Sequence, residues 1–113
     1  MITIAELVRN LQLITIVQAA DQDMINVTGC YLGDLLSNVI AKAETGNLWF
    51  TVMTNVNVIA VAQLLGLAGV VIIEGHQPMP ETVAKAKAEN ILLFSRQDNA
   101  YTAACRFKEA GII

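Results

Sequence analysis

Short apolar runs alternate with amphipathic stretches along the chain, and this alternation predicts strands and helices in turn. Thr3 and Glu6 have the spacing of a capping box, which predicts a short helix beginning at Ile4. Strands are expected at residues 13–17, 24–28, 48–53, 70–73 and 91–94. Later helices are expected at residues 35–43, 56–65 and 80–89, with a final helix ending near residue 110.

Capping signals precede the later helices. Asp34 is placed to cap one helix, and Thr54 and Asn55 offer side-chain oxygens to the free amides of the next. Ser95 and Asp98 repeat the capping-box spacing before the final helix. The second strand is expected to end near residue 29. The polar turn at 19–23 permits a hairpin or a wider excursion, so the order of the first two strands stays open.

From residue 34 onward helices and strands alternate strictly. Such alternation requires crossover connections, which produce a largely parallel sheet covered by helices on both faces. We therefore expect an α/β fold, a single three-layer α/β/α domain spanning residues 1–113, with a mostly parallel sheet of about five strands. Trp49 and Phe50 are neighbours on one strand, so one is expected to face the core and the other a helix layer.

The composition is unusually apolar. Of the 113 residues, 55% are hydrophobic and only 15% are charged, and the mean hydropathy is +0.54. A parallel sheet buried on both faces explains part of this excess. Apolar surface reserved for an interface explains it as well. Both explanations can hold, and the second leads us to expect a homodimer.

Several classes of partner and location are disfavoured. The net charge of −3 argues against a nucleic-acid partner. The longest apolar stretch, residues 58–73, contains Gln63, Gly66 and Gly69 and is too short for a spanning helix, so no membrane partner is expected. The chain shows no targeting segment, and its two cysteines are too few for a disulfide scaffold. The cytoplasm is the expected location.

Polar residues and glycines follow the expected strands, where ligands collect in open α/β sheets. They occupy residues 29–31, 54–57, 74–77 and 95–98, and three of these segments lead into helix starts whose free amides attract anions. Simple helix capping is the alternative explanation for several of them. The candidate ligand-binding residues are Thr54, Asn55, Asn57, Glu74, Gly75, His76, Ser95 and Asp98.

Catalytic groups are hard to assemble from these residues. His76, the only histidine, could act as an acid or base with Glu74, but no partner nucleophile is evident. Cys30 and Cys105 lack metal-ligand spacing and are expected to be small core residues. The sequence contains neither a P-loop nor a dinucleotide-binding motif. We expect no catalytic residue, no metal and no cofactor.

Basic residues gather toward the end of the chain. Five of the seven lysines and arginines lie between residues 85 and 108. Arg96, Arg106 and Lys108 are of the type that attracts phosphates, although a solvated helix face explains the same pattern.

Nearly the whole chain, and residues 27–107 above all, resembles the DRTGG domain family, which shares its fold with the N-terminal domain of HPr kinase/phosphorylase. The resemblance is carried by a series of segments: VTGCYLGD at 27–34, GNLWFTV at 46–52, NVIAVA at 57–62, GVVIIEG at 69–75 and DNAYTAA at 98–104. The namesake residues differ. Thr54 and Asn55 stand where the family often has Asp-Arg, and 73–75 reads IEG in place of Thr-Gly-Gly.

The resemblance implies an accessory regulatory module, because the family occurs beside CBS domains, in some pyrophosphatases and at the front of some phosphotransacetylases. It implies no kinase activity, since that chemistry belongs to a P-loop domain. We expect a non-catalytic, ligand-sensing domain that binds a small anionic or nucleotide-like ligand at the strand-end crevice. The alternatives are a subunit that docks on a protein partner and has no small-molecule site, and a small enzyme that uses His76 and Glu74.

Overall fold

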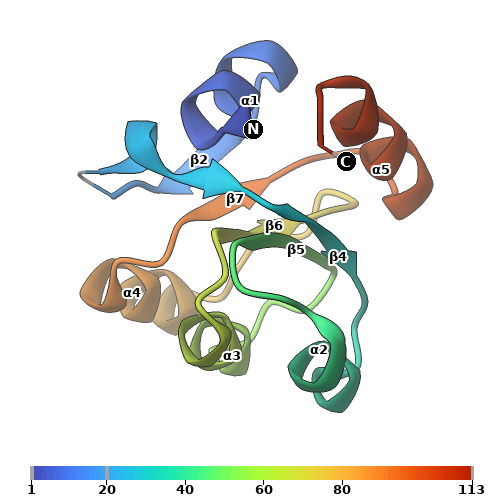
Figure 1. Cartoon of the computed structure of the whole chain (residues 1–113). Helices are drawn as coiled ribbons and strands as arrows, with labels where there is room; N and C mark the ends of the chain where they lie inside the picture. The colour runs from blue at the N-terminus through green and yellow to red at the C-terminus, as the bar shows by residue number, and fades with distance from the viewer. Residues whose placement is uncertain (1, 20, 113) are drawn as a thin grey trace.

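A mixed sheet organises the chain, of which the computed structural model describes residues 2–19 and 21–112. In this described part, five strands form the sheet in the order β2-β7-β6-β5-β4 (Figure 1). β4 to β7 run parallel, and β2 joins β7 antiparallel at one edge. Their bounds are Ile14–Val17 for β2, Gly29–Leu32 for β4, Asn47–Thr51 for β5, Gly69–Ile72 for β6 and Leu93–Ser95 for β7.

Helices cover both faces of this sheet. Figure 1 shows α1 and α5 above the sheet, and α2, α3 and α4 below it. Their bounds are Ile4–Leu11 for α1, Leu36–Lys42 for α2, Asn57–Leu65 for α3, Pro80–Glu89 for α4 and Ala100–Glu109 for α5. The predicted three-layer α/β/α architecture with a mostly parallel sheet is confirmed.

The two faces of the sheet carry separate sets of buried side chains. Along β5, Leu48 and Phe50 pack under α1 and α5, whereas Trp49 packs on the side of α2 to α4. Every residue of β5 and β6 is buried, as expected for parallel strands covered on both faces. The predicted opposition of Trp49 and Phe50 is confirmed, and the Trp49 indole donates to the Gly33 carbonyl at 2.8 Å.

The amino-terminal segment contains the predicted capping box, and its first two predicted strands do not form a hairpin. The Thr3 side chain accepts from the Glu6 amide and the Glu6 carboxylate accepts from the Thr3 amide, so the predicted capping box of α1 is confirmed. The short strand β3 (Asn26–Val27) pairs with β1 (Ile2–Thr3), and β2 lies at the edge of the main sheet opposite β4. Residue 20, in the predicted turn at 19–23, lies outside the described residues; the 3-10 helix Gln22–Met24 follows it.

Two local predictions near β4 are wrong. Residues 29–31 were predicted to follow a strand, but they form most of β4, which pairs with β5 along its length. Asp34 does not cap α2, whose N-cap is Leu35 without a side-chain bond. The Asp34 carboxylate instead accepts from the Thr51 hydroxyl at 2.7 Å and the Val52 amide at 2.9 Å, two donors at the end of β5.

The capping box predicted before the last helix is also wrong. Ser95 ends β7 and is buried, and Asp98 pairs with Arg96. Asn99 caps α5, with its side chain accepting from the Thr102 amide at 2.9 Å. Ser95 pairs with Ile72 and Ile14 on the neighbouring strands, and this sheet pairing outweighs the local capping motif.

Across the described residues, no helix is long and apolar enough to cross a bilayer.

Candidate functional site

The loops that follow β5, β6 and β7 form one row along an edge of the sheet. The parallel strands bring their carboxyl ends to the same edge. The amides of Glu74 and Gly75 donate to the carbonyls of Asp98 and Arg96, both at 3.0 Å, and join the second loop to the third. The Met79 amide and the Thr82 hydroxyl donate to the Thr54 carbonyl, at 3.1 and 2.7 Å, and join the first loop to the start of α4.

The eight candidate residues all lie in this row, but their exposure differs. Asn57, Glu74 and His76 are exposed. Thr54, Asn55, Gly75 and Asp98 are half-buried, and Ser95 is only 3% exposed. The Asn55 side chain accepts from the Asn57 amide at 3.0 Å, so it offers its oxygen to the start of α3 as predicted. Thr54 makes its described hydrogen bonds through its carbonyl.

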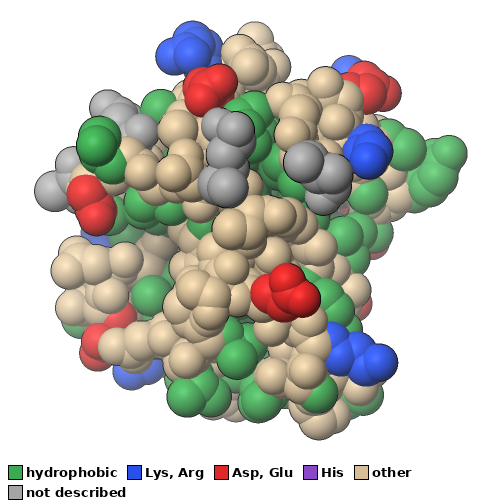
Figure 2. All heavy atoms as spheres, viewed as in Figure 1, with side chains coloured by type: hydrophobic (Ala, Val, Ile, Leu, Met, Phe, Trp, Pro, Cys, Tyr) green, Lys and Arg blue, Asp and Glu red, His purple; other side chains and the backbone are tan. Residues whose placement is uncertain are grey.

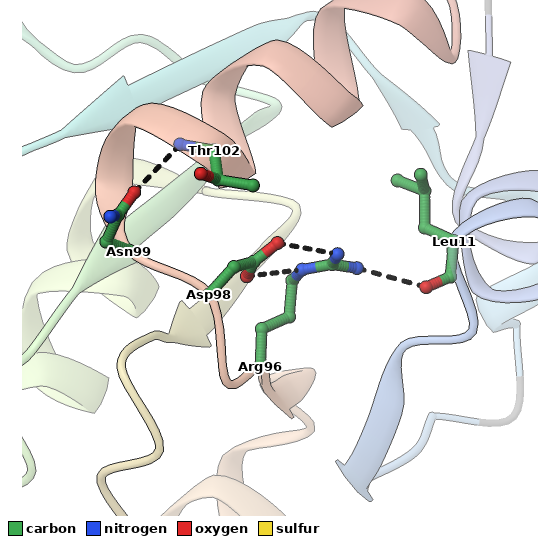
Figure 3. A network of polar contacts seen from close by, with 5 residues as sticks. All are labelled: Leu11, Arg96, Asp98, Asn99 and Thr102. Carbon is green, nitrogen blue, oxygen red and sulfur yellow. Dashed lines mark hydrogen bonds and ion pairs between the residues drawn. The ribbon is translucent and has the colours of Figure 1, made fainter.

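An ion pair holds the third loop against α1 (Figure 3). Arg96 donates to both carboxylate oxygens of Asp98, at 2.9 and 2.8 Å, and to the Leu11 carbonyl at 3.0 Å. Its guanidinium lies 5.4 Å from the ring centre of Phe107. The side chains of Arg96 and Asp98 are 15% and 19% exposed. Such a bidentate, partly buried pair fixes the positions of both residues.

The charges around Asp98 are reflected in its pKa. The hydrogen bonds from Arg96 lower the pKa of Asp98 below its ordinary value, and partial burial opposes this shift. The positive charges of Arg96 and Arg106 lower the pKa further. Asp98 is therefore a carboxylate at neutral pH and serves as an acceptor.

Two adjoining hollows open on either side of this ion pair. They share Leu11, Gln12, Arg96 and Asp98. The first, of about 290 Å³, is completed by Ile14, Ser95 and Gln97. The second, of about 360 Å³, is completed by Asn10, Thr102 and Arg106.

Six of the ten lining residues could not be read from the strand-end rule. That rule identified Ser95 and Asp98, but residues 10–12 come from the end of α1 and Arg106 from α5. They reach the edge because β2 runs antiparallel and begins beside the end of β7, with Ile14 paired to Ser95. The basic cluster that includes Arg96 and Arg106 was the signal in the sequence that pointed to Arg106.

His76 and Glu74 lie apart from both hollows, since neither residue lines them. Gly75, between them, has φ +75°, and a β-carbon there would lie 2.7 Å from the Gln97 side-chain oxygen. The positive φ favours a glycine where the second loop passes the third. Within the described ranges, no three His, Cys, Asp or Glu side chains are grouped to hold a metal ion.

A third hollow, of about 150 Å³, lies beside the edge strand β4. Cys30, Ala104, Lys108 and Ile112 line it. Burial raises the pKa of the Cys30 thiol to about 12, so this cysteine stays protonated at neutral pH. Because the thiolate is the reactive form, this burial disfavours Cys30 as a nucleophile. Its place beside the core agrees with the sequence interpretation.

The comparison with solved structures gives an informative likeness. No protein-family model matches the chain, and no curated protein matches its sequence. A solved structure is similar over 96% of the chain, with a TM-score of 0.76 and 13% sequence identity: the CBS and DRTGG domains of the regulatory region of Clostridium perfringens pyrophosphatase, complexed with the activator diadenosine tetraphosphate.

The predicted DRTGG-like fold is confirmed. At 13% identity the likeness concerns the fold, and the chain spans about half of the solved structure, 46% of its length. The solved DRTGG-containing chain is a regulatory region, which is the class of module that the sequence resemblance implied.

Proposed function

We propose that the chain is a non-catalytic regulatory domain that binds a small anionic or nucleotide-like ligand at the carboxyl edge of its parallel strands. The observation that carries the proposal is the pair of hollows around Arg96 and Asp98, at the place where open α/β sheets bind ligands. The nucleotide activator bound by the structurally similar regulatory region supports the same ligand class.

The proposed ligand contacts extend from these hollows along the row of loops. The polar side chains or backbone of the eight candidate residues supply hydrogen bonds and helix-end amides, with no bond-making role. Asn57 is exposed at the start of α3, and His76 is exposed in the loop between β6 and α4. There they can contact the part of an extended ligand that lies outside the hollows. The proposed residues are Thr54, Asn55, Asn57, Glu74, Gly75, His76, Ser95 and Asp98.

A thermal-shift screen tests the proposal directly. We expect a saturable rise in melting temperature with a member of a panel of nucleotides, dinucleoside polyphosphates and phosphorylated metabolites. A ligand at 100 times its Kd adds about 2.7 kcal/mol of stability. In a domain of this size that is a shift on the order of 10 °C. A flat response to the whole panel would contradict ligand sensing.

Substitutions on the exposed rim test its extent. Asn57→Ala and His76→Ala are each expected to weaken binding of the ligand found by the screen. Asn38→Ala is the matched control, because Asn38 is an exposed asparagine on α2 that belongs to none of the three loops. If both rim variants bind as tightly as the control, the site does not extend to these residues.

A second proposal concerns a partner, and it rests on the edge strand β4. We propose that the domain forms a homodimer in which β4 pairs with β4 of a second copy. β4 is hydrogen-bonded to β5 on one side and contains no charged residue or proline that would discourage pairing. Leu32, Leu35 and Ile40 are exposed on β4, just after it and on α2. Figure 2 shows hydrophobic side chains at the surface around α2, with acidic and basic groups beside them.

The dimer is tested by sedimentation or light scattering at micromolar concentration. Leu35, 60% exposed, is expected to meet its own copy, so Leu35→Glu places two like charges in the interface and should give a monomer. Leu64→Glu changes a leucine on α3 that is 71% exposed and should leave the dimer intact. A monomeric parent protein, or a dimeric Leu35→Glu variant, would overturn this interface and favour docking on another protein.

A further inference from the structure

We infer that the hollow between the end of α1 and α5 receives a phosphoryl group, and that Arg106 is its main charged contact. The inference rests on the proposed ligand-binding function and adds the chemistry of one end of the ligand. The hollow is lined mainly by hydrogen-bonding side chains, including Asn10, Gln12 and Thr102. Figure 3 shows Thr102 projecting from α5 on the side where Arg96 and Leu11 lie.

The charge of the lining favours an anion. Asp98 is its one carboxylate, and both of its oxygens accept from Arg96, so this pair is neutral as a unit. Arg106 is exposed, and no ion pair between described residues involves it. The lining therefore carries one uncompensated positive charge. A metal cation would find no free carboxylate here, so the arrangement disfavours the opposite ligand class.

Arg96 contributes fixed donors next to that charge. A guanidinium has five N–H groups. Three bonds to Asp98 and Leu11 use three of them, which leaves two for a ligand. The Phe107 ring beneath the guanidinium and the bidentate pair hold it in place, so binding orders little that is not already ordered. The Leu11 carbonyl, at the negative end of α1, already accepts from Arg96, which reduces its repulsion of an anion.

The position of the hollow also suggests how binding is transmitted. An anion that bonds to Arg106 on α5 and to Gln12 after α1 bridges two helices on one face of the sheet. In the described residues, Arg96 alone among side chains donates across this junction to the backbone of α1. A bound phosphoryl group adds a second link, so occupancy stiffens the attachment of α1.

The experiment is an amide NMR titration of the full chain with inorganic pyrophosphate and with AMP, using adenosine and chloride of matched ionic strength as controls. We expect the amides of residues 10–12, 96–98 and 102–106 to shift with pyrophosphate and AMP, and to stay in place with adenosine and chloride. Arg106→Ala should weaken the binding of pyrophosphate and of AMP at least about tenfold, as the loss of a charge-assisted hydrogen bond does. Lys108→Ala is the matched control, since Lys108 is a cation on the same helix that lines the hollow beside Cys30.

The possible results separate the inference from the proposed function. Shifts confined to residues 54–57 and 74–77, with Arg106→Ala binding normally, would overturn the inference and leave the ligand-sensing function in place. Equal weakening by Lys108→Ala would reduce the effect to general charge attraction and would also overturn it. If pyrophosphate and AMP cause no shifts while an uncharged ligand binds, the inference that the hollow receives a phosphoryl group is refuted. If neither these probes nor any member of the thermal-shift panel binds, the phosphoryl inference and the ligand-sensing function are both refuted.

Discussion

Phe107→Ala is expected to lower the free energy of unfolding by about 3–5 kcal/mol, the range found when a buried aromatic side chain is truncated. Phe107 is 1% exposed, and its ring meets Phe50 edge-to-face with centroids 4.7 Å apart. The same ring supports the guanidinium of Arg96. The truncation therefore leaves a cavity under α5 and removes the apolar floor of the ion pair. Urea unfolding followed by the fluorescence of Trp49, the only tryptophan, measures the loss.

Two further substitutions show whether that loss comes from packing. Tyr101→Ala, on the same helix, removes an aromatic ring that is 79% exposed and should change stability by less than about 0.5 kcal/mol. Phe107→Leu keeps most of the apolar volume and should lie between the two. Trp49 belongs to the cluster on the opposite face of the sheet, so its fluorescence reports global unfolding. A cooperative transition with a loss below about 1 kcal/mol for Phe107→Ala would contradict the packing described for α5.

The sheet could be predicted from the sequence where burial alone decides the pattern. The continuous apolar runs at 48–53 and 70–73 became β5 and β6, because a parallel strand buried on both faces tolerates few polar residues. β4 escaped prediction. It contains a glycine at its start, is only four residues long and is partly exposed at the sheet edge, so its sequence resembles a turn as much as a strand.

The capping motifs show why local signals have limits. Thr3 and Glu6 form the box that their spacing predicts, and Thr3 does so while it also pairs with Asn26 of β3. Ser95 and Asp98 have the same spacing, but Ser95 is taken into the sheet and Asp98 is taken by Arg96. Asp34 is likewise taken by donors from β5. In these failures sheet pairing, a nearby arginine or the donors of another strand outweighed a cap that contributes only about 1 kcal/mol.

The candidate site was predictable in only part of its lining for a related reason. The rule about parallel strands locates Ser95 and Asp98, since it needs only the order of strands and helices. The contribution of Leu11 and Gln12 depends on β2 joining the sheet antiparallel beside β7, and the sequence left the placement of that strand open. Arg96 links the residues after β7 to the end of α1, because it donates to the Leu11 carbonyl. That acceptor lies 85 residues away in the chain.

Asp98→Asn is expected to lower stability by about 1–3 kcal/mol at pH 7, the range for a charge-assisted hydrogen bond whose partner stays partly buried. Arg96 then keeps its charge without a carboxylate, while its bond to Leu11 remains. Glu109→Gln, an exposed carboxylate on α5, is the matched control and should change stability by less than about 0.5 kcal/mol. Equal effects of the two substitutions would show that the pair contributes no more than surface charge.

The pH dependence of the same variant identifies the ion pair as the cause. Because Arg96 holds the pKa of Asp98 below its unfolded value of about 3.9, the folded state binds the Asp98 proton less readily than the unfolded state does. The stabilisation is complete above that value and is lost as the pH falls below it through the lower folded pKa. The other carboxyl groups titrate in both proteins, so the difference in unfolding free energy between the parent and Asp98→Asn isolates this residue. We expect that difference to be constant from pH 5 to 7 and to shrink steadily below about pH 4. A difference that stays constant down to acid pH would mean that Asp98 stabilises the loop by its shape and hydrogen bonding alone. The negative charge that neutralises Arg96 would then contribute nothing to stability.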